Sequence, residues 1–222
     1  MSDVLDNLGF FAGGMRTTVE LTLIAYAGAL VVGTIVAAFR VSPVPPLRVA
    51  GAIWVELVRN TPLTVLMVLF YFGFTKVGIS YSEMVSAVVV LGAYTSAFIA
   101  EAVRSGINTV ATGQAEAARA IGLTFGQLLR IVVLPQAFRS VVPPLGNLFI
   151  ALLKNSSIAF IIMAGPVVST KLEITGVAFQ LTNDQDLAPI PLYVGAAVAY
   201  LVLTLPSGFA FGWLERRVAI RR

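Results

Sequence analysis

The sequence contains no cysteine and no histidine among its 222 residues. Without cysteine the chain forms no disulfide and offers no thiol nucleophile, and without histidine it has no imidazole base and lacks the commonest transition-metal ligand. Charged residues are also scarce: they make up 12% of the chain, against roughly a quarter in soluble domains. A transition-metal site is therefore not expected. Because so few charges cannot cover the surface of a soluble fold, a large soluble core is not expected either.

Hydrophobic residues make up 58% of the chain, which predicts an all-α integral membrane protein, since lipid needs no charge to face it. The net charge of +4 would suggest nucleic acid as the partner of a soluble protein. In a membrane protein it indicates positively charged cytoplasmic loops, so no nucleic-acid partner is expected. The first fourteen residues carry Asp3 and Asp6 but no basic residue, unlike a cleaved signal peptide, so the first apolar stretch is expected to remain in the chain.

Five stretches are long and apolar enough to cross a membrane, which takes about 20 residues as a helix. They lie near 17–39, 57–75, 84–104, 140–163 and 190–212. The second is the weakest, because Glu56, Arg59, Asn60 and Pro62 crowd its start, and four spans is the alternative count. We predict a single transmembrane domain over 1–222, with a cytoplasmic loop at 105–139 and an extracytoplasmic loop at 164–189.

Arginines define the expected direction of the spans. Ten fall on one side of this map: Arg40, Arg48, Arg104, Arg119, Arg130, Arg139, Arg216, Arg217, Arg221 and Arg222. Only Arg16, Lys76 and Lys171 flank the other side. Cytoplasmic loops carry the excess of basic residues, so the N-terminus is predicted outside and the C-terminus in the cytoplasm.

Two further patterns concern packing. Small residues recur at Ala25, Ala29, Gly33 and Ala37, and again at Gly208 and Gly212, a spacing that permits close approach of helices in lipid. We expect packing within the chain, with a dimer seam as the alternative.

The segment 40–56 contains three prolines and then an apolar stretch too short to span, which fits an interfacial elbow helix or a plain linker.

The loop 105–139 is longer than a turn between two spans requires, which implies an additional task. Its pattern predicts two short helices that meet at Gly122. Thr112 is expected to cap the first helix, with Glu116 in the first turn, and Thr124 with Gln127 has the spacing of a capping box for the second. The alanines of the first helix give a slim surface that a partner groove could admit; an alanine-rich helix that merely covers the bundle is the alternative.

At this point the sequence resembles a known family. Glu116-Ala117-Ala118, followed by Gly122 and by Leu134-Pro135, is similar to the EAA loop of ABC-importer permeases, with Val132 where isoleucine is usual. The resemblance implies a type I permease fold in which this loop, Arg119 included, forms a coupling helix docked in a cleft of an ATPase subunit.

The resemblance covers nearly the whole chain and is closest to the polar amino-acid branch. It is carried by VELVRNTPLTV at 55–65, GAYTSAFIAEAVRSGI at 92–107 and LLKNSSIA at 152–159. It implies two ATPase subunits that hold ATP and magnesium, a second permease that is identical or a sister chain, and an extracytoplasmic amino-acid-binding protein. The chain has no Gly-rich loop ending in Gly-Lys-Ser/Thr, so ATP is expected on the partner and no cofactor on this chain. The implied location is the bacterial cell membrane.

Polar residues within spans are costly and usually face the bundle interior or a water-filled path. The candidates for a substrate path are Asn60, Thr61, Glu101, Lys154, Asn155 and Ser156. Lys154 lies fourteen residues beyond Ser140, roughly 21 Å along a helix and too deep to reach the cytoplasm. Our hypothesis is that Lys154, with Asn155 and Ser156, receives the carboxylates of an acidic amino acid, glutamate first.

Three alternatives stay open for these polar residues. Lys154 would otherwise form a structural ion pair with Glu101 or Glu20. Arg59 is interpreted as the partner of Glu56 at the cytoplasmic entrance of the second span, one helical turn away. Asn60-Thr61-Pro62 fits a broken helix that faces a cavity, because proline removes a helix donor.

Aspartate, glutamine and basic amino acids remain alternative substrates. An intramembrane enzyme with Ser156 or Ser157 and Lys154 is the rival class, but the sequence shows no oxyanion hole to complete it. A stand-alone secondary transporter fits poorly, because no inverted repeat is visible.

Overall fold

The structure is a computed structural model that describes residues 2–164, 171–184 and 187–218, and within these ranges all regular structure is helical. Four helical segments are each long and apolar enough to span a membrane: α2 (Leu8–Val41), α6 (Glu83–Asn108), the continuous helix Arg130–Met163, and α12 (Pro189–Val218). A fifth span is broken. The all-α membrane fold is therefore confirmed, with four spans in the described residues, or five when the bent pair of helices counts as the second span.

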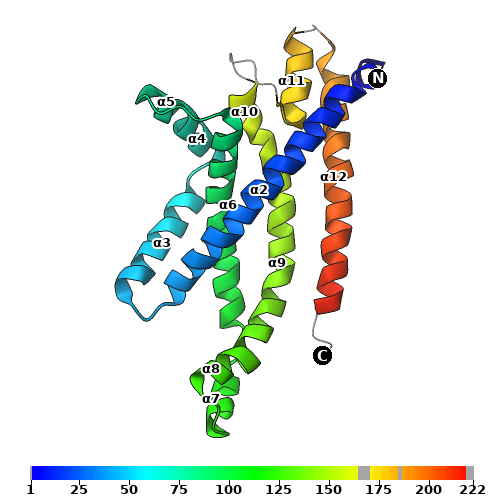
Figure 1. The fold of residues 1–222 in the computed structure, drawn as a ribbon. Coiled ribbons are helices and arrows are strands. Elements are labelled where there is room, and N and C mark those ends of the chain that lie inside the picture. The colour runs from blue at the N-terminus through cyan, green and yellow to red at the C-terminus, as the bar shows by residue number, and fades with distance from the viewer. Residues whose placement is uncertain (1, 165–170, 185–186, 219–222) are drawn as a thin grey trace.

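Helix α2 crosses the bundle obliquely (Figure 1). It follows the short helix α1 (Ser2–Asp6) and begins at Leu8, nine residues before the predicted start of the first span. Its 34 residues measure roughly 51 Å, well beyond the ~30 Å hydrocarbon core, so such a helix must tilt or extend beyond the membrane.

Helices α2 and α6 form the most extensive helix pair in the described chain. The small residues of α2 face this contact and are buried: Ala25, Ala29, Gly33 and Ala37. A Cβ added at Gly33 would lie 2.7 Å from the carbonyl oxygen of Ser96, and one added at Gly92 would lie 3.2 Å from that of Ala25. The expectation of packing within the chain is confirmed for this set. Gly212 has no atom within 4 Å of the corresponding position, so it is not packed in this way.

The second span differs from its predicted bounds of 57–75. Helix α3 (Pro45–Asn60) begins twelve residues earlier, with prolines in its first turn, so most of the segment 40–56 is helical and is not a plain linker; its place at the membrane interface stays a prediction. After a bend of 102° the chain continues as α4 (Leu63–Val68), a π-helical segment (Leu69–Gly73) and α5 (Phe74–Lys76). The bend lies at Thr61-Pro62, so the predicted break in the helix is confirmed.

Helix α3 is fastened to the α2–α6 pair at two points. The Trp54 indole donates a hydrogen bond to the Ser96 hydroxyl at 3.1 Å. Close to the start of α3, a Cβ on Gly51 would lie 3.2 Å from the Val36 carbonyl oxygen, so the backbones of α2 and α3 approach closely there. The remaining side chains of α3 are mostly exposed in the single chain.

The outer part of the chain adds a short helix to the bundle. Helix α9 (Leu134–Asn155) leads through a 3-10 turn (Ser156–Ala159) into α10 (Phe160–Met163). Helix α11 (Ile174–Asp184) then packs against α2 and α12, around a core that includes Phe11, Ile174 and Leu192. The extracytoplasmic loop predicted at 164–189 therefore contains a packed helix.

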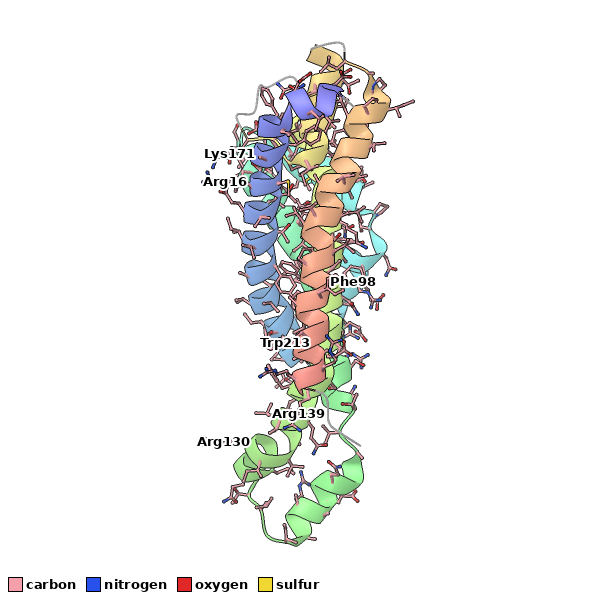
Figure 2. All side chains as sticks on the ribbon, turned by 90° about the vertical axis from the view of Figure 1, so that its right-hand side faces the viewer. Arg16, Phe98, Arg130, Arg139, Lys171 and Trp213 are labelled. Atoms are coloured by element: carbon pink, nitrogen blue, oxygen red, sulfur yellow. The ribbon has the colours of Figure 1, made fainter. Side chains whose placement is uncertain are left out.

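The two ends of the bundle carry the charge asymmetry expected from the sequence. Arg130 and Arg139 lie near the lower end, whereas Arg16 and Lys171 lie near the upper end (Figure 2). The N- and C-terminal helices end at opposite ends of the bundle (Figure 1), as an odd number of spans requires. Arg221 and Arg222 lie outside the described residues. Which end faces the cytoplasm stays a prediction from the arginines.

The glycine contact between α2 and α6 makes a direct prediction. Gly33→Ala places a methyl group against backbone that cannot rotate away, and such overpacking destabilises by about 1–3 kcal/mol. We expect the unfolding midpoint of the detergent-solubilised protein to fall by several degrees. Gly28→Ala on the same helix is the control, because nothing lies within 4 Å of its Cβ position. Equal midpoints for both variants would contradict the close contact.

Candidate functional site

The loop between the third and fourth spans forms a short helix at the lower tip of the molecule (Figure 1). Helix α7 (Thr112–Ala120) begins with Thr112 as its first helical residue, and Ala111 occupies the capping position without a side-chain cap. The prediction that Thr112 caps α7 is therefore wrong. No acidic residue lies in the first turn, so Glu116 is not placed to interact with the helix dipole as expected.

The end of α7 matches the prediction at Gly122. The backbone N–H of Gly122 donates to the Arg119 carbonyl at 2.9 Å, and that of Leu123 donates to the Ala118 carbonyl at 3.1 Å. These two bonds form a Schellman motif, which needs a left-handed residue, and Gly122 supplies it with a φ of +86°. The turn after α7 is therefore set by local hydrogen bonds.

The predicted capping box follows directly. The Thr124 backbone N–H donates to Gln127 Oε1 at 2.9 Å, and the Gln127 N–H donates to Thr124 Oγ1 at 3.4 Å. It starts α8 (Phe125–Gln127), which continues through a π-helical segment (Leu128–Val133) into α9. The second helix of the loop is thus the beginning of the fourth span.

One face of α7 packs on its own chain, and the other is free. Ala118 is 6% exposed and faces inward; the side chain of Ala115 lies outside the described residues. Glu116, Ala117 and Arg119 are exposed. Of the residues predicted for ATPase coupling, Ala118 therefore supports the fold of the loop, whereas these three form an open surface.

The loop is also tied to the base of α9. Gln136 Nε2 donates to Gln114 Oε1 at 2.7 Å, which connects α7 to the first turn of α9. Leu134 and Pro135 begin α9 and are exposed. Helix α7 is therefore joined to α9 by a side-chain hydrogen bond as well as through the turn at Gly122.

At the other end of α9 the predicted polar residues point in different directions. Lys154 is exposed, and among the described residues it forms no ion pair. Asn155 is half-buried, whereas Ser156 is fully buried and donates to the Leu153 carbonyl at 2.7 Å. The Ser156 hydroxyl is therefore used inside the helix and does not face an open path.

Asn155 opens into a cavity of about 210 Å³ between α6 and α9. Its walls are Tyr94, Thr95, Phe98, Leu148, Ala151, Leu152 and Asn155. Such a lining, mostly apolar and aromatic with a few polar groups, is typical of sites for small molecules. Figure 2 shows Phe98 near mid-height of the bundle.

Arg59 lies against one wall of this cavity. Its guanidinium carbon is 5.2 Å from the centroid of the Phe98 ring, in a cation–π contact. The interpretation of Arg59 as the ion-pair partner of Glu56 is wrong, because Glu56 Oε2 instead accepts a hydrogen bond from Asn60 Nδ2 at 3.0 Å. Since α3 begins at Pro45, Arg59 lies roughly 21 Å along the helix and not at its entrance.

Asn60 and Thr61 stabilise the break in the helix. Asn60 Nδ2 donates to the Glu56 carbonyl at 2.8 Å, and Thr61 Oγ1 donates to the Leu57 carbonyl at 2.7 Å. These bonds satisfy carbonyl groups that the interrupted helix leaves free, which is how helix breaks are tolerated within a membrane. A direct role of either side chain in the substrate path stays a prediction.

The carboxylates proposed as alternative partners of Lys154 are engaged elsewhere. Glu101 pairs with Arg40 at 3.1 Å and also with Arg104, which joins the ends of α2 and α6. Glu20 pairs with Arg16 at 2.8 Å and lies 3.9 Å from Lys171. The interpretation of Lys154 as the partner of Glu101 or Glu20 is therefore wrong for this chain.

A larger cavity of about 460 Å³ lies at the upper end, between α2 and the start of α11. Its charged lining consists of Arg16, Glu20 and Lys171, which already interact with one another. It lies near the end of the bundle, where Figure 2 shows Arg16 and Lys171. We therefore regard the smaller cavity beside Phe98 as the better candidate for a site within the membrane.

Glu173, beside this upper cavity, is a residue that the sequence reading missed. Its carboxylate is fully buried and accepts hydrogen bonds from the backbone N–H groups of Thr175 and Gly176, at 2.8 and 2.6 Å, and from the Tyr200 hydroxyl at 2.6 Å. It thus caps α11 and ties it to α12. The signal in the sequence was a lone carboxylate between Leu172 and Ile174.

Burial raises the pKa of the Glu173 carboxyl to about 7, although the three hydrogen bonds favour the charged form. The usual value for glutamate is about 4.3. Because the folded protein holds this proton more tightly than the unfolded chain, the contribution of Glu173 to stability is fully present below about pH 4.3 and is lost as the pH rises through about 7.

Comparison with known proteins assigns the family. Residues 29–220 match the family described as binding-protein-dependent transport system inner membrane component. The chain belongs to this family. It is therefore a multi-pass permease subunit of the inner membrane, with the fold expected from the EAA-like loop.

Relatives refine the class of importer. The permease is 39% identical to the probable glutamine ABC transporter permease protein GlnM of Bacillus subtilis (strain 168), over 98% of this chain and 97% of the relative. It is also 39% identical to the glutamate transport system permease protein GluC of Corynebacterium glutamicum, over 92% of each chain. The chain is a permease subunit of an amino-acid ABC importer.

Solved structures agree with the fold. A chain from a crystal structure of an amino acid ABC transporter with histidines superposes with a TM-score of 0.88 at 30% identity, over 96% of both chains. The inward-facing MetNI methionine ABC transporter matches with a TM-score of 0.75 at 22% identity, over 96% of this chain and 98% of that one, and supports the fold alone.

The Glu173 site predicts a pH dependence of the permease. Raising the pH from 5 to 8 should lower the unfolding midpoint in detergent, and a folded pKa near 7 corresponds to at most roughly 3 kcal/mol. Glu173→Gln should flatten this pH dependence, because the amide does not titrate; the exposed Asp6→Asn is the control. If Glu173→Gln keeps the wild-type pH dependence, the proton is bound elsewhere.

Proposed function

We propose that this permease imports glutamate, and that the substrate passes through the cavity between α6 and α9. The observation that carries the proposal is the Arg59 cation against one wall of this cavity, together with the exposed Lys154 on α9. Arg59 contacts the cavity wall at Phe98, Lys154 precedes the cavity residue Asn155, and neither forms an ion pair among the described residues. Unpaired cations within a membrane are costly, and an acidic substrate would neutralise them.

Glutamine is the second candidate. The relative GlnM is named for glutamine and is as similar to this chain as GluC, which is named for glutamate. Both amino acids have side chains of the same length, and Asn155 could hydrogen-bond either end group. Arg59 against Phe98 and Lys154 on α9 favour the acidic side chain, because a cation suits a carboxylate better than an amide.

The assembly proposed for transport contains further subunits. Two copies of this permease, or this chain with a sister permease, enclose the path; two ATPase subunits bind ATP and magnesium below, and an extracytoplasmic binding protein delivers the amino acid. The exposed face of α7, with Glu116 and Arg119, docks on the ATPase. Closure of the ATPases then moves α7, and the continuous helix Arg130–Met163 carries the motion to Lys154 and Asn155.

Replacing the lysine tests the substrate. In proteoliposomes that contain the complete importer, Lys154→Met should reduce glutamate uptake about ten- to a hundredfold, because a charge-assisted hydrogen bond is lost. Lys76→Met, which removes an exposed lysine at the end of α5, is the matched control and should transport normally. Wild-type uptake by an intact Lys154→Met complex would exclude the lysine from the substrate site.

Reversing one charge on α7 tests the coupling. In the reconstituted wild-type complex, glutamate and the binding protein should stimulate ATP hydrolysis. Glu116→Lys should abolish this stimulation, because it reverses the charge of the exposed docking face. Glu215→Lys, an exposed carboxylate near the end of α12, is the control. Hydrolysis that ignores both Glu116→Lys and every amino acid tested would reject the coupling role of this loop.

A further inference from the structure

Two opposite charges on α3 lie one helical turn apart and do not pair. Residues three positions apart on a helix face the same side, so Glu56 and Arg59 would be expected to form an ion pair. In the structure Asn60 holds the Glu56 carboxylate at 3.0 Å, and the Arg59 guanidinium instead lies 5.2 Å from the Phe98 ring centroid. Each charged group therefore has a neutral neighbour that keeps it away from the other.

This separation is energetically unusual at this depth. Both groups lie near the end of α3, just before the break, and both side chains are exposed in the single chain. Opposite charges in a low-dielectric environment attract strongly, and ionisable groups within membranes usually pair. A pair that is held open suits a ligand that carries both complementary charges.

The α-carbon of an amino acid carries those two charges on neighbouring atoms. Its carboxylate matches the planar fork of a guanidinium, which binds carboxylates through two parallel hydrogen bonds. Its ammonium matches a carboxylate acceptor such as Glu56. A site that recognised only the side-chain carboxylate of the ligand would require Arg59 but not Glu56. The carboxylates of the unbroken spans, Glu20 and Glu101, are already held in ion pairs by other cations, and Arg59 acts on Glu101 only at longer range.

We propose that Arg59 binds the α-carboxylate and Glu56 the α-ammonium of the transported amino acid, at the break between α3 and α4. Arg59 touches Phe98, which lines the same cavity as Asn155. The amino-acid head is then held by α3, and the side chain extends across the cavity toward Asn155 and Lys154 on α9. This assignment rests on the proposed translocation site and adds the two residues that recognise what all amino acids share.

The first experiment uses the wild-type complex of permease and ATPase without its binding protein, so that only the membrane site selects. Bound radiolabelled glutamate is competed with glutamate, with glutarate, which lacks the ammonium, and with 4-aminobutyrate, which lacks the α-carboxylate. Both analogues should compete at least about tenfold more weakly than glutamate. If either competes as well as glutamate, the corresponding contact is refuted. If the complex binds no amino acid at all, the proposed translocation site itself fails.

The second experiment uses variants and separates head recognition from side-chain recognition. Arg59→Gln and Glu56→Gln should weaken the binding of glutamate and glutamine by the same factor, about ten- to a hundredfold, whereas Lys154→Met should weaken glutamate more than glutamine. Arg48→Gln, at the other end of α3 and exposed, is the matched control and should bind normally. Arg59→Lys should restore part of the affinity, because it keeps the charge but loses the planar fork.

Binding measurements on the same variants can also overturn the proposal. If Arg59→Gln loses glutamate but binds glutamine as the wild type does, Arg59 recognises the side chain and not the head. If it binds both normally, Arg59 has no role in recognition. Assembly is checked by size-exclusion chromatography; should a variant fail to assemble, the competition by glutarate and 4-aminobutyrate on the wild-type complex still decides.

Discussion

The close contact between α2 and α6 is the constraint on which the rest of the structure depends. Between helices in lipid there is little hydrophobic driving force, so van der Waals packing has to hold them together. Gly33 and Gly92 let backbone meet backbone there, and a single methyl group at Gly33 would collide with the Ser96 carbonyl. Ser96 in turn accepts the hydrogen bond from Trp54 that positions α3. The cavity, which α6 shares with α9, is therefore built outward from this contact.

The distribution of charges follows a consistent division of roles. Carboxylates at the edges of the bundle, Glu20 and Glu101, are neutralised by arginines or lysine and fasten helices to one another. Lys154 and Arg59 form no ion pair in the described part of the chain, and the Arg59 charge acts on Glu101 only at longer range. The two carboxylates that fasten helices are thus held in ion pairs, whereas the two cations of the proposed substrate site are not.

The loop proposed for coupling and the cavity are connected by one helix. The Schellman motif at Gly122 and the capping box at Thr124 define the turn, and Gln114 joins α7 to α9 through Gln136. From there the continuous helix Arg130–Met163 reaches Lys154 and Asn155. Although Pro143 and Pro144 interrupt its hydrogen bonds, this helix is continuous along the chain, so a movement at α7 has a direct route to the proposed substrate site.

The sequence by itself determined the membrane class, five apolar segments, the break at Thr61-Pro62 and the turn at Gly122, because hydrophobic runs, proline and glycine act locally. Only the tertiary structure decided where α3 begins, that Arg59 leaves Glu56 for Phe98, that Glu101 binds Arg40, and that Ser156 is buried. Each of these depends on which helices meet and at what depth. A pattern along one chain does not contain that information, since several partners are always within reach until packing selects one.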